Sequence, residues 1–389
     1  MQTKTKSILF VLPRFPLPTD KGDKLRAWEQ IKVLSKSYKL YVICFHDLKL
    51  EISEEHSSEI AKYVEELRLF PIGKWDMLWA GIRTLSRKIP FQVAYYYHPW
   101  FKKELEKTVK EFQPDFIFYQ LIRVAPYLIK NKAKTVLDIM DCMSHNVYLR
   151  LATEKGIAKL FWTSEYKRLL AYESKIIPSF DYACIISERD RKMLPNGVGK
   201  KVITLSNGID THKFKPGNAE RKTDVLFVGN LSYKPNIEAC IWLVEDILPE
   251  LHKKGIYPSV KLVGSSPDKK VLKLAEVRGV EVFANVPDTV PYYQDAKIMA
   301  APMRINTGQQ NKILEAMACA CNVITTSNAN DGIQAPDHCI LVADESKDFA
   351  AAIESVLNNE KHPAQYARAF VEERFSWEAH TERFFRNLV

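Results

Sequence analysis

The chain has no long hydrophobic run. Its uninterrupted apolar stretches, such as residues 8–12, fall far short of the ~20 residues that a helix needs to cross a bilayer. That stretch leads into Pro13, Pro16 and Pro18 rather than into a small-residue cleavage site, so it lacks the form of a signal peptide. We therefore expect a cytoplasmic protein without membrane-spanning helices.

Cysteine is also sparse and shows neither a disulfide nor a metal-binding pattern. The seven cysteines are scattered, odd in number and contain no C-x-x-C pair, which predicts a reduced compartment and no zinc site. They are Cys44, Cys142, Cys184, Cys240, Cys319, Cys321 and Cys339. No G-x-G-x-x-G follows the first predicted strand, which disfavours a dinucleotide-binding dehydrogenase.

The sequence is long enough for two globular domains. Its 389 residues exceed one ordinary core and fit two domains of roughly 100 to 200 residues each. A content of 46% hydrophobic and 26% charged residues is typical of soluble globular proteins.

Positive charge is concentrated in the first half. Residues 1–200 hold 34 Lys and Arg against 23 Asp and Glu, whereas residues 201–389 hold 22 against 24. This imbalance suggests that the first domain meets an anionic surface, such as phospholipid, lipid-linked phosphate or nucleic acid. Alternatively, the excess of Lys and Arg serves only to keep the protein soluble. The aromatic and basic residues form no recognisable nucleic-acid-binding module, so we expect no nucleic-acid partner.

Alternating strands and helices predict an α/β fold with two doubly wound parallel sheets. In the first half the predicted strands are residues 7–13, 39–45, 68–71, 116–120, 135–139, 182–187 and 202–205. In the second half they are residues 224–228, 260–264, 281–284, 297–301 and 322–325. Among the predicted helices are residues 51–66, 124–130 and 144–177.

Turn-rich residues 206–217 connect the two series. We therefore expect domains at residues 1–205 and 206–370. Residues 371–389 are expected to form a C-terminal helix that packs back toward the first domain. The apolar side chains that this segment has to bury are Trp377, Phe384, Phe385 and Leu388.

Residues 74–103 interrupt the alternation with a run of aromatic and basic residues. Apolar side chains fall on one helical face between Trp75 and Ile89, and Tyr95, Tyr96 and Tyr97 follow. Such a face could lie in a membrane interface, because aromatic and basic residues suit the headgroup region. It could also be ordinary core, as such faces often are.

Several polar residues follow the ends of strands in the first half, where open parallel sheets bind their ligands. Gly22 would let the backbone approach a bound group closely, or it is a plain turn residue. Gln120, Arg123 and Asp141 are candidates for an acceptor site. Asp138 and Asp141 could orient a substrate hydroxyl, although two acids without a third ligand are a weak metal signal.

A strand, a loop and a helix start are predicted between residues 297 and 319. The unpaired N–H groups of a helix start could hold phosphate or sugar oxygens near Gly308. Lys312 would lie on the first turn and Glu315 one turn further on, although Glu315 could be only a good helix former. The loop at residues 229–236 repeats the pattern with Lys234. Two such ammonium groups would neutralise a diphosphate leaving group, on which charge builds as the bond breaks.

Together these motifs resemble the retaining glycosyltransferases of group 1 (family 4), which have the GT-B fold of two Rossmann-like domains facing across a cleft. The resemblance rests on the loop at Gly22, residues 207–216, residues 228–234 and residues 312–319. Residues 21–26 and 310–315 are similar to those of bacterial sugar transferases associated with exopolysaccharide gene clusters.

The resemblance implies that the second domain binds a UDP-, GDP-, dTDP- or ADP-sugar, with no metal or other cofactor. Glu315 would match the acid that holds the ribose hydroxyls, and Lys312 and Lys234 would face the diphosphate. The other implied donor-binding residues are Gly22, Gly229, Asn230, Thr307, Gly308, Gln309, Gln310 and Asn311.

The sequence departs from the family pattern in three places. Thr307 stands where the family usually has a second acid, so contacts to the donor sugar must differ. Asn230 replaces the usual arginine, which leaves the two lysines to carry the phosphate charge. The usual histidine of the first domain has no match, because the strand exit near residue 120 reads Tyr119-Gln120.

We therefore expect retaining transfer to a lipid-linked or polysaccharide acceptor, at the cytoplasmic side and in peripheral contact with an anionic membrane. With no carboxylate placed as a nucleophile, a same-face mechanism assisted by the leaving diphosphate is favoured over a covalent intermediate. The alternatives are a catalytically inactive GT-B binding or scaffold protein and a GT-B-like sugar-nucleotide epimerase.

Overall fold

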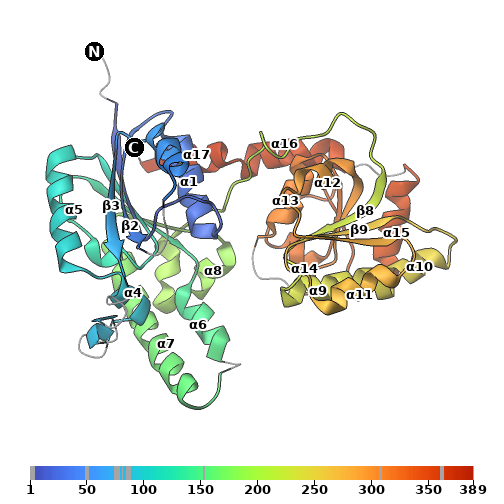
Figure 1. Ribbon diagram of the computed structural model, residues 1–389, viewed down its shortest axis with the longest axis horizontal. Coiled ribbons are helices and arrows are strands. Elements are labelled where there is room, and N and C mark those ends of the chain that lie inside the picture. The colour runs from blue at the N-terminus through green and yellow to red at the C-terminus, as the bar shows by residue number, and fades with distance from the viewer. Residues whose placement is uncertain are drawn as a thin grey trace. The chain divides into compact units, whose positions relative to one another are not determined.

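The computed structural model describes residues 5–48, 52–73, 79–80, 82–84, 89–151, 154–305, 309–359 and 363–388. The chain divides into two compact units (Figure 1). The first comprises Met1–Asn207 with Thr381–Val389, and the second comprises Gly208–His380. Each unit is a parallel sheet with helices packed on both faces, which confirms the predicted α/β class.

The first sheet has seven parallel strands in the order β3-β2-β1-β4-β5-β6-β7. The strands are β1 (Ser7–Leu12), β2 (Lys39–Asp47), β3 (Glu66–Ile72), β4 (Phe116–Gln120), β5 (Lys134–Met140), β6 (Tyr182–Ile185) and β7 (Ile203–Thr204). The strand order reverses direction between β1 and β4. Such a reversal opens a crevice at the carboxyl ends of the strands, where doubly wound sheets bind ligands.

Alternate residues of β1 pack into two different hydrophobic cores, one on each face of the sheet. Ile8, Phe10 and Leu12 of β1 pack under α1 (Gly22–Leu34) and α17 (Trp377–Leu388). Leu9 and Val11 face the opposite side, which α5 (Pro99–Phe112) and α7 (Gly156–Ile176) cover. Figure 1 shows α1 beside α17 and α5 across the sheet from them. Because both faces are buried, β1 reads as one continuous apolar run.

The C-terminal helix α17 completes the core of the first unit. Phe384, Phe385 and Leu388 are buried in the cluster that contains Phe116 and Phe118 of β4. The rings of Phe385 and Phe118 lie 5.8 Å apart. Residues at the end of the chain therefore contribute apolar packing to the unit in which the chain begins.

Among the described residues, the first unit also contains the helices α2 (Glu54–Ala61), α4 (Phe91–Tyr95), α6 (Met143–Leu151) and α8 (Glu188–Met193). Two helix predictions were wrong. Residues 144–177 form α6 and α7 rather than one helix, and α7 begins at Gly156, whose φ of +57° is left-handed and cannot continue a helix. The predicted helix at residues 124–130 is only a short 3₁₀ turn, Ala125–Tyr127.

The aromatic run before α5 belongs to the core where the structure describes it. Tyr96 and Phe101 are buried, and both rings contact Phe45 of β2. Trp79 and Ile82 are exposed, by 54% and 50%. The predicted helical face also includes Lys74, Trp75, Leu78, Leu85, Arg87 and Lys88, which lie outside the described residues. Within the described ranges, no helix has the length and apolar character needed to span a membrane.

The second sheet has six parallel strands in the order β10-β9-β8-β11-β12-β13. They are β8 (Thr223–Val228), β9 (Val260–Gly264), β10 (Val280–Ala284), β11 (Ala296–Ala301), β12 (Asn322–Thr325) and β13 (Leu341–Val342). Five of them occur within one residue of the predicted bounds. The sixth, β13, was not predicted because two residues show no periodicity.

Helices cover both faces of the second sheet around a single core (Figure 1). They are α9 (Lys234–Trp242), α10 (Leu248–His252), α11 (Lys269–Lys273), α12 (Val290–Asp295), α13 (Asn311–Ala318), α14 (Ser327–Asn330), α15 (Ser346–Leu357) and α16 (Ala364–Phe375). The order of this sheet reverses between β8 and β11. The loops that leave these two strands lead to α9 and α13, so both helices start at the switch point.

Candidate active site

Lys312 is the cation at the switch point of the second sheet. It is the second residue of α13, and its Nζ donates a hydrogen bond of 2.6 Å to Oδ1 of Asn236 on α9. The same ammonium group lies 4.6 Å from the centre of the Phe227 ring on β8. Burial lowers the pKa of Lys312 to about 8, because removal from water disfavours the charged form. In the described part of the chain Lys312 is half-buried and forms no ion pair with an acid, so its ammonium group is suited to meet an anion.

Asn236 joins the two loops that leave the switch point. Its Nδ2 donates to the main-chain carbonyl of Asn230 at 2.8 Å, while its Oδ1 accepts from Lys312. The side chain of Asn230 bends back onto its own loop and accepts from the N–H and hydroxyl of Ser232. Asn230 therefore shapes the loop, and Lys312 provides a positive charge in this region.

Gly229 leaves room for this arrangement. A Cβ on Gly229 would lie 2.8 Å from Nδ2 of Asn236 and 3.3 Å from Nζ of Lys312. At the end of the neighbouring strand, a Cβ on Gly264 would lie 1.6 Å from the carbonyl oxygen of Gly229. Both glycines are required because backbone and site side chains approach one another closely at this edge.

Glu315 lies one turn beyond Lys312 and is held by a buried tyrosine. Its Oε2 accepts a hydrogen bond of 2.9 Å from the hydroxyl of Tyr293 on α12. Burial raises the pKa of Glu315, whereas the Tyr293 hydroxyl and the positive charges of Lys213 and Lys312 oppose the rise. The carboxylate is thus fixed in orientation and keeps a second oxygen for a ligand.

The other predicted donor residues occupy different positions. Lys234 is exposed at the first residue of α9, and its ammonium group makes no hydrogen bond or ion pair within the described ranges. Gln309, Gln310 and Asn311 are half-buried at the start of α13, where Gln310 makes no side-chain capping bond. Thr307 and Gly308 lie outside the described residues.

In the first unit, Gly22 begins α1 and is exposed. A Cβ on Gly22 would meet no atom within 4 Å, so nothing within its surroundings requires a glycine there. Gln120, at the end of β4, is buried and donates from Nε2 to the carbonyl of Asp23 at 2.8 Å. The Gln120 side chain therefore anchors the start of α1 to the sheet.

Asp138 is a fully buried structural residue. Its Oδ2 accepts from Nε of Arg26 at 2.6 Å, and both side chains are fully buried. The guanidinium of Arg26 also donates to the carbonyl of Leu205 and to Oδ1 of Asn207. This ion pair ties α1 to β5, which corrects the expectation that Asp138 orients a substrate.

Asp141 belongs to a group of titratable side chains beyond β5. Burial and the nearby charge of Asp190 raise the pKa of Asp141, and Arg123 opposes the rise. Glu173 of α7 accepts the N–H of Ser144 at 3.1 Å, and burial raises its pKa to about 7. Arg123 itself donates to Oε1 of Gln92 on α4 at 2.7 Å.

The backbone is strained at the same strand ends. Leu121, which follows β4, has a φ of 67°, and Met140, which ends β5, has a φ of 66°. Both values lie in the left-handed region that non-glycine residues seldom adopt. Such strain persists only where the surrounding structure fixes it, and it is frequent at functional sites.

A pocket of about 440 Å³ lies at the carboxyl ends of β1, β2 and β3. Its lining includes His46, His56, Asp47, Lys21, Phe15 and Tyr95. No histidine was predicted for this domain, because only the exit of β4 was considered. His46 could have been found from its position directly after the apolar run of β2, at the ligand-binding edge.

A family model matches the second unit. Residues 222–359 match the family described as "Glycosyl transferases group 1". These residues include β8, α9, α13, Lys312 and Glu315.

Two curated proteins are similar in sequence. A protein of Klebsiella pneumoniae, "Uncharacterized 44.6 kDa protein in cps region", is 22% identical over 353 residues, which are 84% of each chain. A subunit of the phosphatidylinositol N-acetylglucosaminyltransferase of Arabidopsis thaliana is 21% identical over 197 residues, or 47% of this chain. This second match spans 43% of the Arabidopsis protein, less than half of its length.

Solved structures share the whole architecture at low identity. A glycosyltransferase from Rickettsia africae has a TM-score of 0.65 and 12% identity, with 98% of this chain and 97% of that chain covered. HepE of Anabaena, solved in complex with UDP-glucose, has a TM-score of 0.62 and 12% identity over 98% and 99% of the chains. This chain therefore has the GT-B fold, and residues 222–359 of its second domain match the group 1 glycosyl transferases.

Proposed function

We propose that this protein transfers a sugar from a nucleotide-diphosphate sugar, bound by its second domain, to a hydroxyl group of a lipid-linked or polysaccharide acceptor. The observation that carries the proposal is the arrangement on α13. There, a lysine held at the strand edge and a carboxylate held one turn later lie on one short helix. The similarity to HepE, which was solved with UDP-glucose, supports this type of donor.

Each donor group has a partner in this arrangement. The diphosphate binds the ammonium group of Lys312 and the N–H groups at the start of α13, because both carry positive charge. Lys234, exposed at the start of α9, adds a second ammonium group. Glu315 accepts hydrogen bonds from the ribose hydroxyls through its free oxygen, while Tyr293 holds the other.

The chemistry is a substitution at the anomeric carbon with retention of configuration. The acceptor oxygen forms a bond to that carbon on the face from which the diphosphate leaves. The bond between the carbon and the diphosphate oxygen breaks, and its electron pair stays with the phosphate. The acceptor proton passes to the departing phosphate oxygen, so no protein base is needed. Lys312 stabilises the charge that develops on the diphosphate.

The acceptor binds the basic first domain. The pocket at the ends of β1 to β3 offers histidines, a carboxylate and aromatic rings, which suit a sugar hydroxyl and its ring. Gly22, Arg123 and Asp141 lie at the same edge of the sheet. The relative encoded in a cps region supports a polysaccharide, and the relative named for a phosphatidylinositol substrate supports a lipid-linked acceptor.

The protein works at the cytoplasmic face of a membrane, to which its first domain binds by charge. The excess of Lys and Arg in residues 1–200 motivates this location. Co-sedimentation with phosphatidylglycerol vesicles should fall as salt rises, because screening weakens attraction between exposed charges. If the protein sedimented equally with neutral and with phosphatidylglycerol vesicles, binding of the first domain to the membrane by charge would be contradicted.

A donor screen followed by a transfer assay tests the function. Thermal unfolding is measured with UDP-, GDP-, dTDP- and ADP-sugars, since a ligand at 100 times its dissociation constant stabilises by ~2.7 kcal/mol. Transfer of the selected sugar, followed by NMR, should give a product of unchanged anomeric configuration. Lys312→Ala and Glu315→Ala should abolish transfer without unfolding the protein.

Matched controls are available on the same domain. Lys273 and Glu276 are exposed, and their side chains form no hydrogen bond or ion pair in the described part of the chain, so Lys273→Ala and Glu276→Ala should act as wild type. Wild-type turnover by the Lys312 and Glu315 variants would contradict the assignment of these two residues to the active site. Donor binding without transfer or hydrolysis would favour a scaffold, and an epimerised donor sugar released without acceptor would favour an epimerase.

A further inference from the structure

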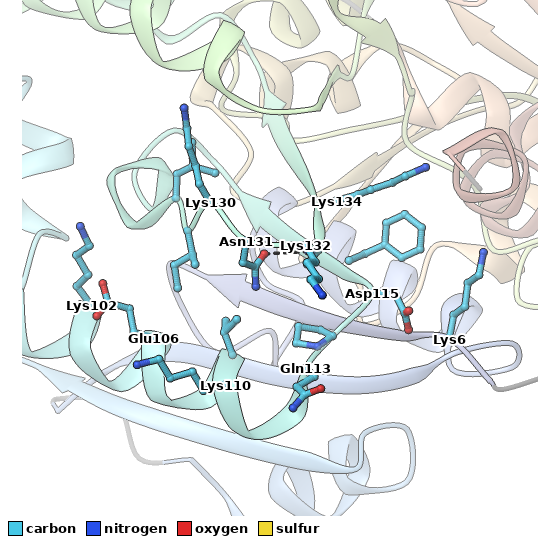
Figure 2. Close-up of a pocket in the computed structure, with 16 residues that line it drawn as sticks. Lys6, Lys102, Glu106, Lys110, Gln113, Asp115, Lys130, Asn131, Lys132 and Lys134 are labelled. Carbon is cyan, nitrogen blue, oxygen red and sulfur yellow. Dashed lines mark hydrogen bonds between the residues drawn. The ribbon is translucent and has the colours of Figure 1, made fainter.

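A large cavity lies on the first unit, away from the residues discussed above (Figure 2). Its volume is about 1110 Å³, and it lies where β4 begins at Phe116 and β5 begins at Lys134. Gln120 and Asp141 follow the carboxyl ends of the same two strands. The cavity therefore occupies the opposite edge of the first sheet from the acceptor candidates.

Lysines surround this cavity (Figure 2). The described lysines that line it come from three separate stretches of the sequence, and they are Lys6, Lys102, Lys110, Lys130, Lys132 and Lys134. Among the described residues, Glu106 and Asp115 are the only acids that line it with them. The carboxylate of Asp115 is already bound, because Oδ2 accepts from the N–H and the hydroxyl of Ser7 at 2.8 and 3.2 Å. A surplus of positive charge remains at the rim.

Most of these ammonium groups have no partner in the protein. In the ranges that the structure describes, Lys102, Lys110, Lys130 and Lys132 form no side-chain hydrogen bond or ion pair. Lys134 differs, because its Nζ donates to the carbonyl of Leu388 at 2.6 Å. Like charges grouped without counter-charges repel each other, and a bound anion would relieve that repulsion.

The floor of the cavity is apolar. Val109, Phe116 and Ala133 are buried there, and Leu128 and Ile129 are half-buried. A small inorganic anion would leave this surface uncovered. An organic ligand would place its charged end at the lysines and its uncharged part on the floor.

The cations at this cavity suit a phosphate group. No arginine is among the residues that line the described cavity. Arginine binds carboxylates and phosphates alike through a planar two-point contact, whereas lysine acts as a point charge and is a common ligand of phosphate. We propose that this cavity is a binding site for a phosphate-bearing organic ligand, separate from the site for the donor. The ligand is either a soluble phosphate ester or the headgroup of a phospholipid.

The test measures binding of two probes to lysine variants of the full chain. The soluble probe is glucose 1-phosphate, followed by calorimetry, and the lipid probe is vesicles of phosphatidylglycerol in phosphatidylcholine, followed by sedimentation. Lys130→Ala with Lys132→Ala, and separately Lys102→Ala with Lys110→Ala, should weaken binding of one probe by about tenfold or more. Lys155→Ala with Lys159→Ala removes the same charge from exposed positions on the first unit and should bind as wild type.

A further variant tests whether the probe binds at the donor site instead of in this cavity. Lys312→Ala should retain binding of the probe, whether or not the function proposed for Lys312 is correct. Loss of glucose 1-phosphate binding in the cavity variants assigns a soluble ligand, and loss of vesicle binding alone assigns a headgroup. The inference is overturned if neither probe binds the wild type, or if both cavity variants bind as the control variant does.

Discussion

At the scale of single residues, the site depends on how burial changes the charge of Lys312. Its pKa lies near 8, because the ammonium group is packed against Phe227 and Asn236 with little water. A donor diphosphate binds the protonated form. The protein therefore takes up a proton on Lys312 when the donor binds at a pH where the free protein has lost that proton.

The first prediction is a dependence of donor affinity on pH. Below pH 8 Lys312 is charged and the dissociation constant should be flat, and above pH 8 it should rise by up to about tenfold per pH unit. Calorimetry in buffers of different ionisation enthalpy should show proton uptake near pH 8. Lys312→Ala should bind weakly at every pH. A wild-type affinity that stays constant from pH 7 to pH 9 would contradict this account of Lys312.

At the scale of helices and strands, the crowded switch point of the second sheet shapes the donor site, and Glu173 holds the start of α6 in the first unit. Gly229 at the end of β8 faces Asn236 and Lys312, and a side chain there would displace them. Gly229→Ala should therefore weaken donor binding while the sheet still forms. Donor affinity and far-UV circular dichroism would be measured together. Gly73→Ala, whose Cβ would lie 3.7 Å from a Leu48 methyl, is the control and should bind donor normally.

The raised pKa of Glu173 predicts that the stability of the first unit depends on pH. Its pKa is about 7 in the fold and 4.5 is its ordinary value, so the folded protein binds the proton more tightly than the unfolded chain. Its contribution to stability is full below pH 4.5 and is lost as pH rises through 7. Glu173→Gln keeps an oxygen that accepts the N–H of Ser144 and never ionises. At pH 8 it should be the more stable protein, by an amount on the order of 3 kcal/mol or less.

The comparison is made by urea unfolding of both proteins at pH 5 and pH 8. The gap between Glu173→Gln and wild type should be large at pH 8 and small at pH 5. A gap of the same size at both pH values would show that ionisation of Glu173 is not involved.

Strands were predicted more accurately than helices and site contacts, for physical reasons. The strands at residues 260–264 and 322–325 have the predicted bounds because buried parallel strands are apolar runs that polar loops interrupt. The break before α7 was missed because the left-handed φ of Gly156 leaves no periodic signal. Asn236 and Tyr293 were missed because they reach Lys312 and Glu315 from helices 76 and 22 residues away in sequence.

At the scale of the whole chain, the two units share one polypeptide that ends in the unit where it begins. Phe385 of α17 is fully buried against Phe116 and Phe118. Phe385→Ala should destabilise the first unit by about 3–5 kcal/mol, because it leaves a cavity in that core. Hydrogen exchange should then be faster in β1 and β4 and unchanged in β8 and β11.

The control for this variant is Tyr257→Ala, since Tyr257 is 71% exposed on the second unit. It should leave exchange in both sheets as in wild type. If Phe385→Ala instead accelerated exchange only in the second sheet, the assignment of α17 to the first core would be wrong.

The function proposed for this protein requires that α13 binds a nucleotide-diphosphate sugar through Lys312 and Glu315. The most direct measurement is a calorimetric titration of the wild type, Lys312→Ala, Glu315→Ala and Lys273→Ala with the nucleotide selected by the donor screen. We expect one site per chain in the wild type and in Lys273→Ala, and affinity at least roughly tenfold weaker in the other two variants. Equal affinity in all four proteins would contradict it.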